Sequence, residues 1–250
     1  MGKLTNKVAV VTGGNSGIGL SAAKLFAEEG ACVYITGRRQ TELDAAVEFI
    51  GHGATGVLGD VTNNEDLDRL YARIKAEQGH VDVVFANAGN FKNNALLADI
   101  TEEHIDQSFD VHVRAVLFTV QKALPLLRDG ASIVLNASAA TCKGLASLSV
   151  YAASKAAVRS FARTWTAELA HRKIRTNVVS AAFIETPLFD AAGMTKEQFG
   201  AFRDSVMPSV PLGRFGDADE VAKAVLYLAS DDSTFVSGQE LFVDGGFVSI

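Results

Sequence analysis

The sequence predicts an α/β fold in which helices cover both faces of a parallel β-sheet, the arrangement called doubly wound. Short apolar runs rich in Val and Ile alternate along the chain with longer segments of helical pattern. These runs are apolar on both faces, which is typical of parallel strands that are buried on both sides. No repeat, linker or low-complexity stretch divides the 250 residues, so we expect a single domain, 1–250.

Seven strands and six helices are expected, in alternating order. The strands cover residues 8–12, 32–36, 55–59, 81–86, 132–137, 174–181 and 239–243. The helices cover residues 17–29, 40–50, 64–78, 102–127, 150–171 and 217–229. One connection, residues 187–211, is too long for a simple turn, and it follows the carboxyl end of a strand. Open α/β sheets bind ligands at that edge, which predicts a substrate lid; an additional surface helix is the alternative.

Composition excludes several classes of partner. The net charge is -6, and Lys and Arg are dispersed, so neither nucleic acid nor a membrane surface is expected. No apolar run reaches the about 20 residues that a membrane helix needs. Cys32 and Cys142 form neither a disulfide framework nor a metal-ligand spacing, which indicates a cytoplasmic protein without a metal.

A glycine-rich turn joins the first strand to the first helix. Gly13, Gly17 and Gly19 allow a tight turn and let the backbone approach a pyrophosphate at the positive end of the helix. The intervening candidates for cofactor contacts are Asn15, Ser16 and Ile18. Because this pattern lies between the first strand and the first helix, it predicts a dinucleotide-binding site.

The cofactor's type is indicated at the end of the second strand. Arg38 and Arg39 stand where an NAD-selective site places an acidic side chain, and residues 36–39 contain no Asp or Glu. An arginine suits a 2′-phosphate, which favours NADP(H); the alternative is that both arginines only face solvent.

Three residues have the side-chain types and the spacing of a proton-transfer site. Ser138 ends a predicted strand, and Tyr151 and Lys155 share one face of the following helix because they are four residues apart. A nearby ammonium favours the phenolate of a tyrosine whose ordinary pKa is about 10. The serine hydroxyl can orient a substrate oxygen.

At this point the sequence resembles the short-chain dehydrogenase/reductase family, over nearly the whole chain. The motifs that carry the resemblance are a TGxxxGxG turn, an Asp-Val pair, an NAG turn, a serine before YxxxK, and a closing VDGG. Here they are Thr12 to Gly19, Asp60 with Val61, Asn87 to Gly89, Ser138, Tyr151 with Lys155, and Val243 to Gly246. The details are similar to bacterial NADP-dependent secondary-alcohol dehydrogenases that reduce bulky ketones.

The resemblance implies a Rossmann fold, usually in a homotetramer, and hydride transfer between a nicotinamide and a carbonyl or alcohol. It implies that Tyr151 is the general acid/base, that Lys155 lowers its pKa and binds the nicotinamide ribose, and that Ser138 holds the substrate oxygen. Further cofactor contacts that it implies are Asp60, Val61, Asn87, Ala88, Gly89, Ile184 and Thr186.

The sequence departs from the family at His112. The family normally has an asparagine there, and its backbone carbonyl holds a water that connects the catalytic lysine to solvent. Three alternatives stay open: the relay persists through the backbone carbonyl, His112 itself transfers a proton, or it packs in a site that has lost activity. Ala181 and Ala182 replace the usual Pro-Gly, and Ala115 a common glycine.

The expected substrate pocket is apolar or small. Its residues are Leu145, Ser147, Leu148, Phe183, Leu188 and Phe189. Without an arginine among them to bind a carboxylate or phosphate, we expect a neutral, hydrophobic ketone. One alternative is reduction of a 3-oxoacyl group on acyl carrier protein, with Arg128, Arg172 and Lys173 as candidate docking residues. Another is a non-catalytic NADP(H)-binding sensor or scaffold.

Overall fold

The computed structural model describes residues 2–92, 94–187 and 193–250, and it contains the predicted seven-stranded parallel sheet. The strands are β1 (Val8–Thr12), β2 (Cys32–Gly37), β3 (Thr55–Leu58), β4 (Val81–Ala86), β5 (Leu127–Asn136), β6 (Arg175–Ala181) and β9 (Glu240–Val243). Their order is β3-β2-β1-β4-β5-β6-β9. A small second sheet, which the sequence analysis did not predict, pairs β7 (Ile184–Glu185) with β8 (Gly216–Asp217).

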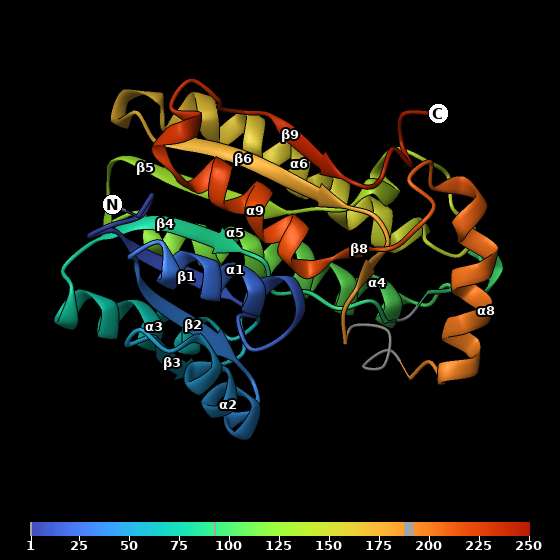
Figure 1. Cartoon of the computed structure of the whole chain (residues 1–250), viewed down its shortest axis with the longest axis horizontal. Coiled ribbons are helices and arrows are strands. Elements are labelled where there is room, and N and C mark those ends of the chain that lie inside the picture. Colours follow the sequence, from blue (N-terminus) through green and yellow to red (C-terminus); the bar gives the residue numbers. More distant parts are fainter. Residues whose placement is uncertain (1, 93, 188–192) are drawn as a thin grey trace.

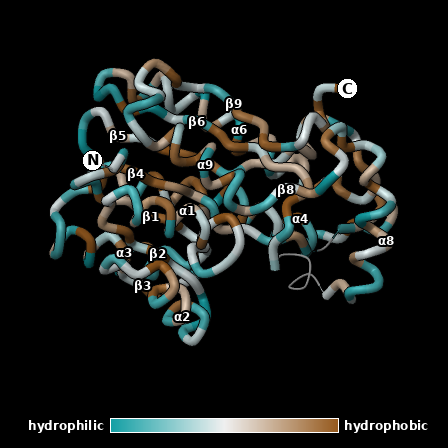
Figure 2. Tube along the Cα trace, viewed as in Figure 1, coloured by the Kyte–Doolittle hydropathy of each residue, from teal (hydrophilic) through white to brown (hydrophobic). Residues whose placement is uncertain are grey.

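Helices cover both faces of the sheet (Figure 1). They are α1 (Gly17–Glu28), α2 (Gln40–Ile50), α3 (Asn64–Glu77), α4 (Glu102–Phe109), α5 (Ala115–Ala123), α6 (Ser149–Glu168), α8 (Lys196–Val206) and α9 (Ala218–Ala229). One apolar core joins α1, α2 and α9 to one face, and a second joins α3, α5 and α6 to the other. The hydrophobic residues accordingly concentrate along the strands (Figure 2).

The predicted helix 102–127 is wrong in two respects. It is interrupted by a π-helical segment, Asp110–Arg114, and it ends at Ala123. Pro125 cannot donate a backbone hydrogen bond, so the chain tightens and the N–H of Leu126 bonds the carbonyl of Ala123 at 2.8 Å. The strand β5 consequently begins at Leu127, five residues earlier than predicted.

The segment predicted as a lid contains α8, which lies beyond the carboxyl-terminal ends of the strands (Figure 1). Aromatic contacts tie it to the domain: the ring of Phe183 lies 6.0 Å from that of Phe202 on α8 and 5.0 Å from that of Phe247. Its part 188–192 lies outside the described residues. Within the residues that the structure describes, no helix has both the length and the apolar character that crossing a bilayer requires.

Candidate active site

A cavity of about 450 Å³ lies at the carboxyl-terminal ends of the strands. Its walls come mainly from the turns that follow β1, β2, β3, β4, β5 and β6. The strand order reverses between β1 and β4, so the connections leave in opposite directions and a crevice opens there. The predicted glycine turn and the predicted catalytic residues therefore meet in one place.

The glycine turn has the backbone conformation that its glycine residues predict. Gly17 has a φ of 52°, in the left-handed region that favours glycine. Gly19 lies beneath the turn, where a Cβ would overlap the carbonyl oxygen of Gly13 and lie 2.5 Å from Nδ2 of Asn87. The turn consequently packs tightly against the loop after β4, and the N-terminus of α1 faces the cavity. Free N–H groups at this helix end suit a pyrophosphate.

Nearly all of the predicted cofactor residues line this cavity. They are Gly13, Asn15, Ser16, Gly17, Ile18, Arg38, Arg39, Asp60, Val61, Asn87, Ala88, Gly89, Tyr151, Lys155, Ile184 and Thr186. Gly19 supports the turn from below without lining the cavity. The residues present fit a dinucleotide, because a side chain at Gly19 would close the turn that a pyrophosphate needs.

Arg38 lines the cavity just after β2. Its side chain is 62% exposed, and its guanidinium lies 3.7 Å from the carboxylate of Asp60. An exposed ion pair of this kind contributes little to stability, about 0–1 kcal/mol. The guanidinium therefore remains able to bind an anion that enters the cavity.

A hydrogen-bonded network connects the glycine turn to Lys155. Asn87 donates from Nδ2 to the carbonyl of Thr12 at 3.0 Å, and accepts at Oδ1 from Asn136 at 2.9 Å. Lys155 Nζ in turn donates to the backbone carbonyl of Asn136 at 2.9 Å. Thr12 and Asn136 end the strands β1 and β5, and Asn87 follows β4. The ends of three adjacent strands therefore hold Lys155 beside the glycine turn.

Ser138, Tyr151 and Lys155 all line the cavity. Burial raises the pKa of Tyr151 above its ordinary value of 10.0, and a hydrogen bond with Ser138 offsets this in part. Desolvation of the phenolate is thus the largest influence on the pKa of Tyr151. Lys155 Nζ lies 5.9 Å from the Tyr151 ring centroid, and burial lowers the lysine pKa to about 8.

His112 lies against these residues, 1% exposed. Burial and, second, the charge of Lys155 lower its pKa to about 3. Its imidazole is therefore neutral near pH 7 and lacks the pKa that a proton-transfer group needs.

Sequence reasoning missed several residues of the cavity. Asn90, Phe91 and Lys92 follow the NAG turn, Val111 precedes His112, and Asn136 precedes Ser138. The ring of Phe91 packs edge-on against that of Tyr151, with centroids 5.2 Å apart. The place of Asn136 at the end of β5 and of Asn90, Phe91 and Lys92 in the loop after β4 was a usable signal, because such positions converge at the carboxyl edge of a sheet. Val111, in the π-helical segment, had no such signal.

The predicted substrate residues are placed less uniformly. Leu145, Ser147 and Leu148 are half-buried in the loop between Ser138 and Tyr151, and do not line the 450 Å³ cavity. The backbone carbonyl of Ser147 accepts from Ala95, which ties this loop to the one after β4. Leu188 and Phe189 lie outside the described residues.

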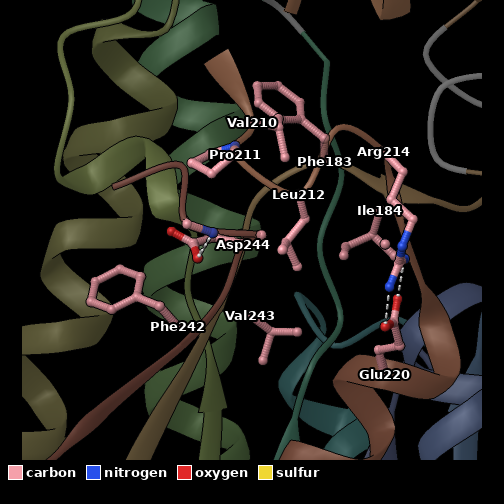
Figure 3. Close-up of a pocket in the computed structure, with 13 residues that line it drawn as sticks. Phe183, Ile184, Val210, Pro211, Leu212, Arg214, Glu220, Phe242, Val243 and Asp244 are labelled. Atoms are coloured by element: carbon pink, nitrogen blue, oxygen red, sulfur yellow. Dashed lines mark hydrogen bonds and ion pairs between the residues drawn. The ribbon is translucent and has the colours of Figure 1, made fainter. Parts of the chain in front are cut away.

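Phe183 faces a second cavity of about 400 Å³, which adjoins the first at Ile184. Figure 3 shows Val210, Pro211 and Leu212 around it, and the Arg214–Glu220 ion pair at its side. Phe183 packs against the ring of Phe215, with centroids 5.6 Å apart. Because its ring also contacts that of Phe202, Phe183 connects the place where the two cavities adjoin to α8.

Comparisons with known proteins agree with this geometry. Residues 13–248 match a family model described as Enoyl-(Acyl carrier protein) reductase. The chain is 45% identical to Oxidoreductase asL5 of Sarocladium schorii, over 99% of this chain and 98% of that one. It is 37% identical to 3-oxoacyl-[acyl-carrier-protein] reductase FabG of Thermotoga maritima, over 98% of this chain and 99% of that one. Among solved structures, Levodione Reductase is similar with a TM-score of 0.92, at 25% identity and covering 98% and 99% of the two chains.

Proposed function

Because the chain belongs to the short-chain dehydrogenase/reductase family of oxidoreductases, whose cofactor is a nicotinamide dinucleotide, we propose that it reversibly reduces a neutral, hydrophobic ketone to a secondary alcohol with NADPH. The observation that carries the proposal is the meeting of Ser138, Tyr151 and Lys155 in the same cavity as the glycine turn and Arg38. Neutral and apolar groups next to Tyr151, chiefly Phe91, favour an aryl- or alkyl-substituted ketone.

A dihydronicotinamide, when bound in this cavity, would supply the hydride. Tyr151 donates the phenol proton to the substrate oxygen, and its raised pKa keeps that proton in place at neutral pH. Ser138 orients the same oxygen with its hydroxyl. Lys155, fixed by the carbonyl of Asn136, presents an ammonium below its pKa of about 8, which stabilises negative charge as it develops on the phenol oxygen.

Arg38 and Arg39 are the residues that would bind the 2′-phosphate of NADPH. A charge-assisted hydrogen bond of this sort contributes about 1.5–3 kcal/mol. The preference for NADPH over NADH therefore depends mainly on residues at the end of β2.

Tyr151→Phe tests the proposal. General acid catalysis contributes about 100-fold or more, so this variant should lose ketone reduction by at least that factor while its NADPH dissociation constant stays within about twofold. Loss of NADPH absorbance with a panel of bulky ketones measures the first, and fluorescence titration the second. Full activity of the variant contradicts the assigned acid. Tight NADPH binding by the wild-type chain without turnover of any ketone would favour a sensor or scaffold.

Reduction of a 3-oxoacyl thioester is the second candidate function, because relatives at 37% and 34% identity carry that name. The predicted basic docking residues do not support it. Arg172 pairs with Asp129, and Arg128 lies 3.8 Å from Asp82. Both lie near the start of β5, at the sheet edge opposite the cavity. Comparing the free thioester with the same group on acyl carrier protein decides between the candidates: a large preference for the carrier-bound form favours the second.

We also propose that the protein is a cytoplasmic homotetramer. Large apolar side chains are exposed in the carboxyl-terminal part of the chain, namely Leu212, Tyr227, Phe235 and Ile250. Light scattering after size exclusion tests the assembly. Cys32 and Cys142 are free thiols, which suits a reducing compartment.

A further inference from the structure

The imidazole of His112 bridges two parts of the active site. It lies in the π-helical segment Asp110–Arg114. Its Nε2 is 3.0 Å from the carbonyl oxygen of Asn90 and 3.2 Å from the N–H of the same residue. Its Nδ1 is 3.1 Å from Oγ of Ser154 and 3.3 Å from Oγ of Ser108. One side of the ring is thus bonded to the loop after β4, and the other to helix α6.

On the α6 side, the bridge reaches the backbone of the catalytic tyrosine. The hydroxyl of Ser154, which is fully buried, donates to the carbonyl oxygen of Tyr151 at 2.7 Å. The His112 ring also packs edge-on against the Tyr151 ring, with centroids 5.4 Å apart. His112 therefore touches Tyr151 directly and supports its backbone through Ser154.

On the loop side, the bridge holds the residues that face the substrate. Asn90 and Phe91 line the cavity, and Phe91 packs edge-on against Tyr151. The loop is pressed close to the ring, because a Cβ on Gly89 would lie 3.3 Å from Cδ2 of His112. A change in the His112 ring must therefore move Phe91 relative to Tyr151.

The ring performs this task without a charge. A neutral imidazole has one N–H, and either tautomer is satisfied: Nε2–H donates to Asn90 while Ser108 donates to Nδ1, or Nδ1–H donates to Ser154 while Asn90 N–H donates to Nε2. Among the described residues, the titratable groups that face the ring are Tyr151 and Lys155, both from α6. The ammonium of Lys155 opposes a second positive charge next to it.

We propose that His112 is a positioning residue, which sets the place of Phe91 over Tyr151 by bridging the Asn90 backbone to Ser154, and that it transfers no proton. It thereby determines which ketones fit beside the catalytic phenol. The kinetic part of this inference rests on the proposed function, whereas the protonation state of the His112 ring does not.

The protonation state of the His112 ring is tested first, in the full chain without substrate. Nitrogen NMR of protein labelled at histidine, with His112→Asn to assign the signals, should show for His112 one protonated and one unprotonated ring nitrogen, unchanged from about pH 5 to pH 9. Titration of His112 within this range would overturn the proposal, and a protein that reduces no ketone still gives this result.

Kinetics test the positioning role. His112→Phe keeps a ring but removes both hydrogen bonds, so KM for a bulky ketone should rise about tenfold or more, with a smaller change in kcat and no change in the pH profile of kcat. His112→Asn, which can still donate and accept, should restore part of the lost affinity. The exposed His171→Asn is the matched control and should match the wild type in both constants.

The opposite pattern contradicts the inference. If His112 transferred a proton, its replacement would lower kcat at constant KM and would shift the pH profile of kcat. If His112→Phe does not fold, Ser154→Ala removes one end of the bridge and should produce the same rise in KM on a smaller scale. An unchanged KM in Ser154→Ala would then overturn the proposal.

Discussion

Replacing the buried lysine should stabilise the protein while it abolishes activity. Lys155 is 5% exposed, and burial lowers its pKa from 10.5 to about 8. The folded state therefore disfavours the ammonium relative to the unfolded chain. The variant Lys155→Met keeps an unbranched side chain of similar length and removes the charge.

The magnitude follows from the pKa change. One pH unit corresponds to about 1.4 kcal/mol, so lowering the pKa from 10.5 to about 8 reflects about 3 kcal/mol of lost stability. The methionine cannot donate to the Asn136 carbonyl, and an unsatisfied buried group costs about 1–2 kcal/mol. The net gain in the free energy of unfolding at pH 7 is therefore about 1–2 kcal/mol.

The contribution of Lys155 to the free energy of unfolding changes with pH in a definite direction. Below about pH 8 the lysine is charged in both states, and the full cost is present. Between about pH 8 and 10.5 the unfolded chain still binds the proton while the folded one releases it, so wild-type stability rises with pH from this group. The advantage of Lys155→Met should thus shrink by about 2–3 kcal/mol from pH 7 to pH 10.5.

Urea unfolding of the cofactor-free protein at the two pH values measures this difference. Lys75→Met, at an exposed position on α3, is the matched control and should show the same small effect at both. An advantage for Lys155→Met that is constant or larger at pH 10.5 would refute the reasoning, because the ammonium would then not be the destabilising group.

Three other changes have expected outcomes. Arg38→Ala should raise the NADPH dissociation constant about tenfold or more and the NADH constant much less; equal effects in a fluorescence titration remove the 2′-phosphate argument. Gly19→Ala should abolish NADPH binding because its Cβ overlaps the Gly13 carbonyl, whereas Gly200→Ala, with open space in α8, should bind normally and gain about 0.5–1 kcal/mol in urea unfolding. Alcohol oxidation requires deprotonated Tyr151, whose pKa is raised, so its rate should climb from pH 7 to pH 10 while ketone reduction does not; parallel profiles contradict this.

The sheet and the cofactor residues could be predicted because their signals are local. Strands buried on both faces are continuous apolar runs, and the glycine turn must follow the first of them. Because parallel strands end at a common edge, the turn, Arg38 and the serine at the end of β5 were expected to converge. The motifs and their order along the chain were therefore enough to predict most of the residues that line the cavity beside the glycine turn.

The misses occurred where contacts between distant segments decide the outcome. The π-helical segment that contains His112 has an ordinary helical sequence pattern, and the contacts of this histidine with Ser154 and Asn90 join segments that are far apart in the chain. Phe91 had no motif, yet its ring lies on Tyr151. Arg172 was a candidate docking residue, but it lies at the opposite edge of the sheet.

By itself, the sequence determined the fold class, the edge of the sheet at which the 450 Å³ cavity lies, and the three residues Ser138, Tyr151 and Lys155 that meet in it. These follow from hydrophobic periodicity and from backbone rules that act over a few residues. Only the tertiary structure decided the protonation states, since the pKa values of Tyr151, Lys155 and His112 depend on how completely their surroundings exclude water. Desolvation is a property of the packed core, and no short stretch of sequence encodes it.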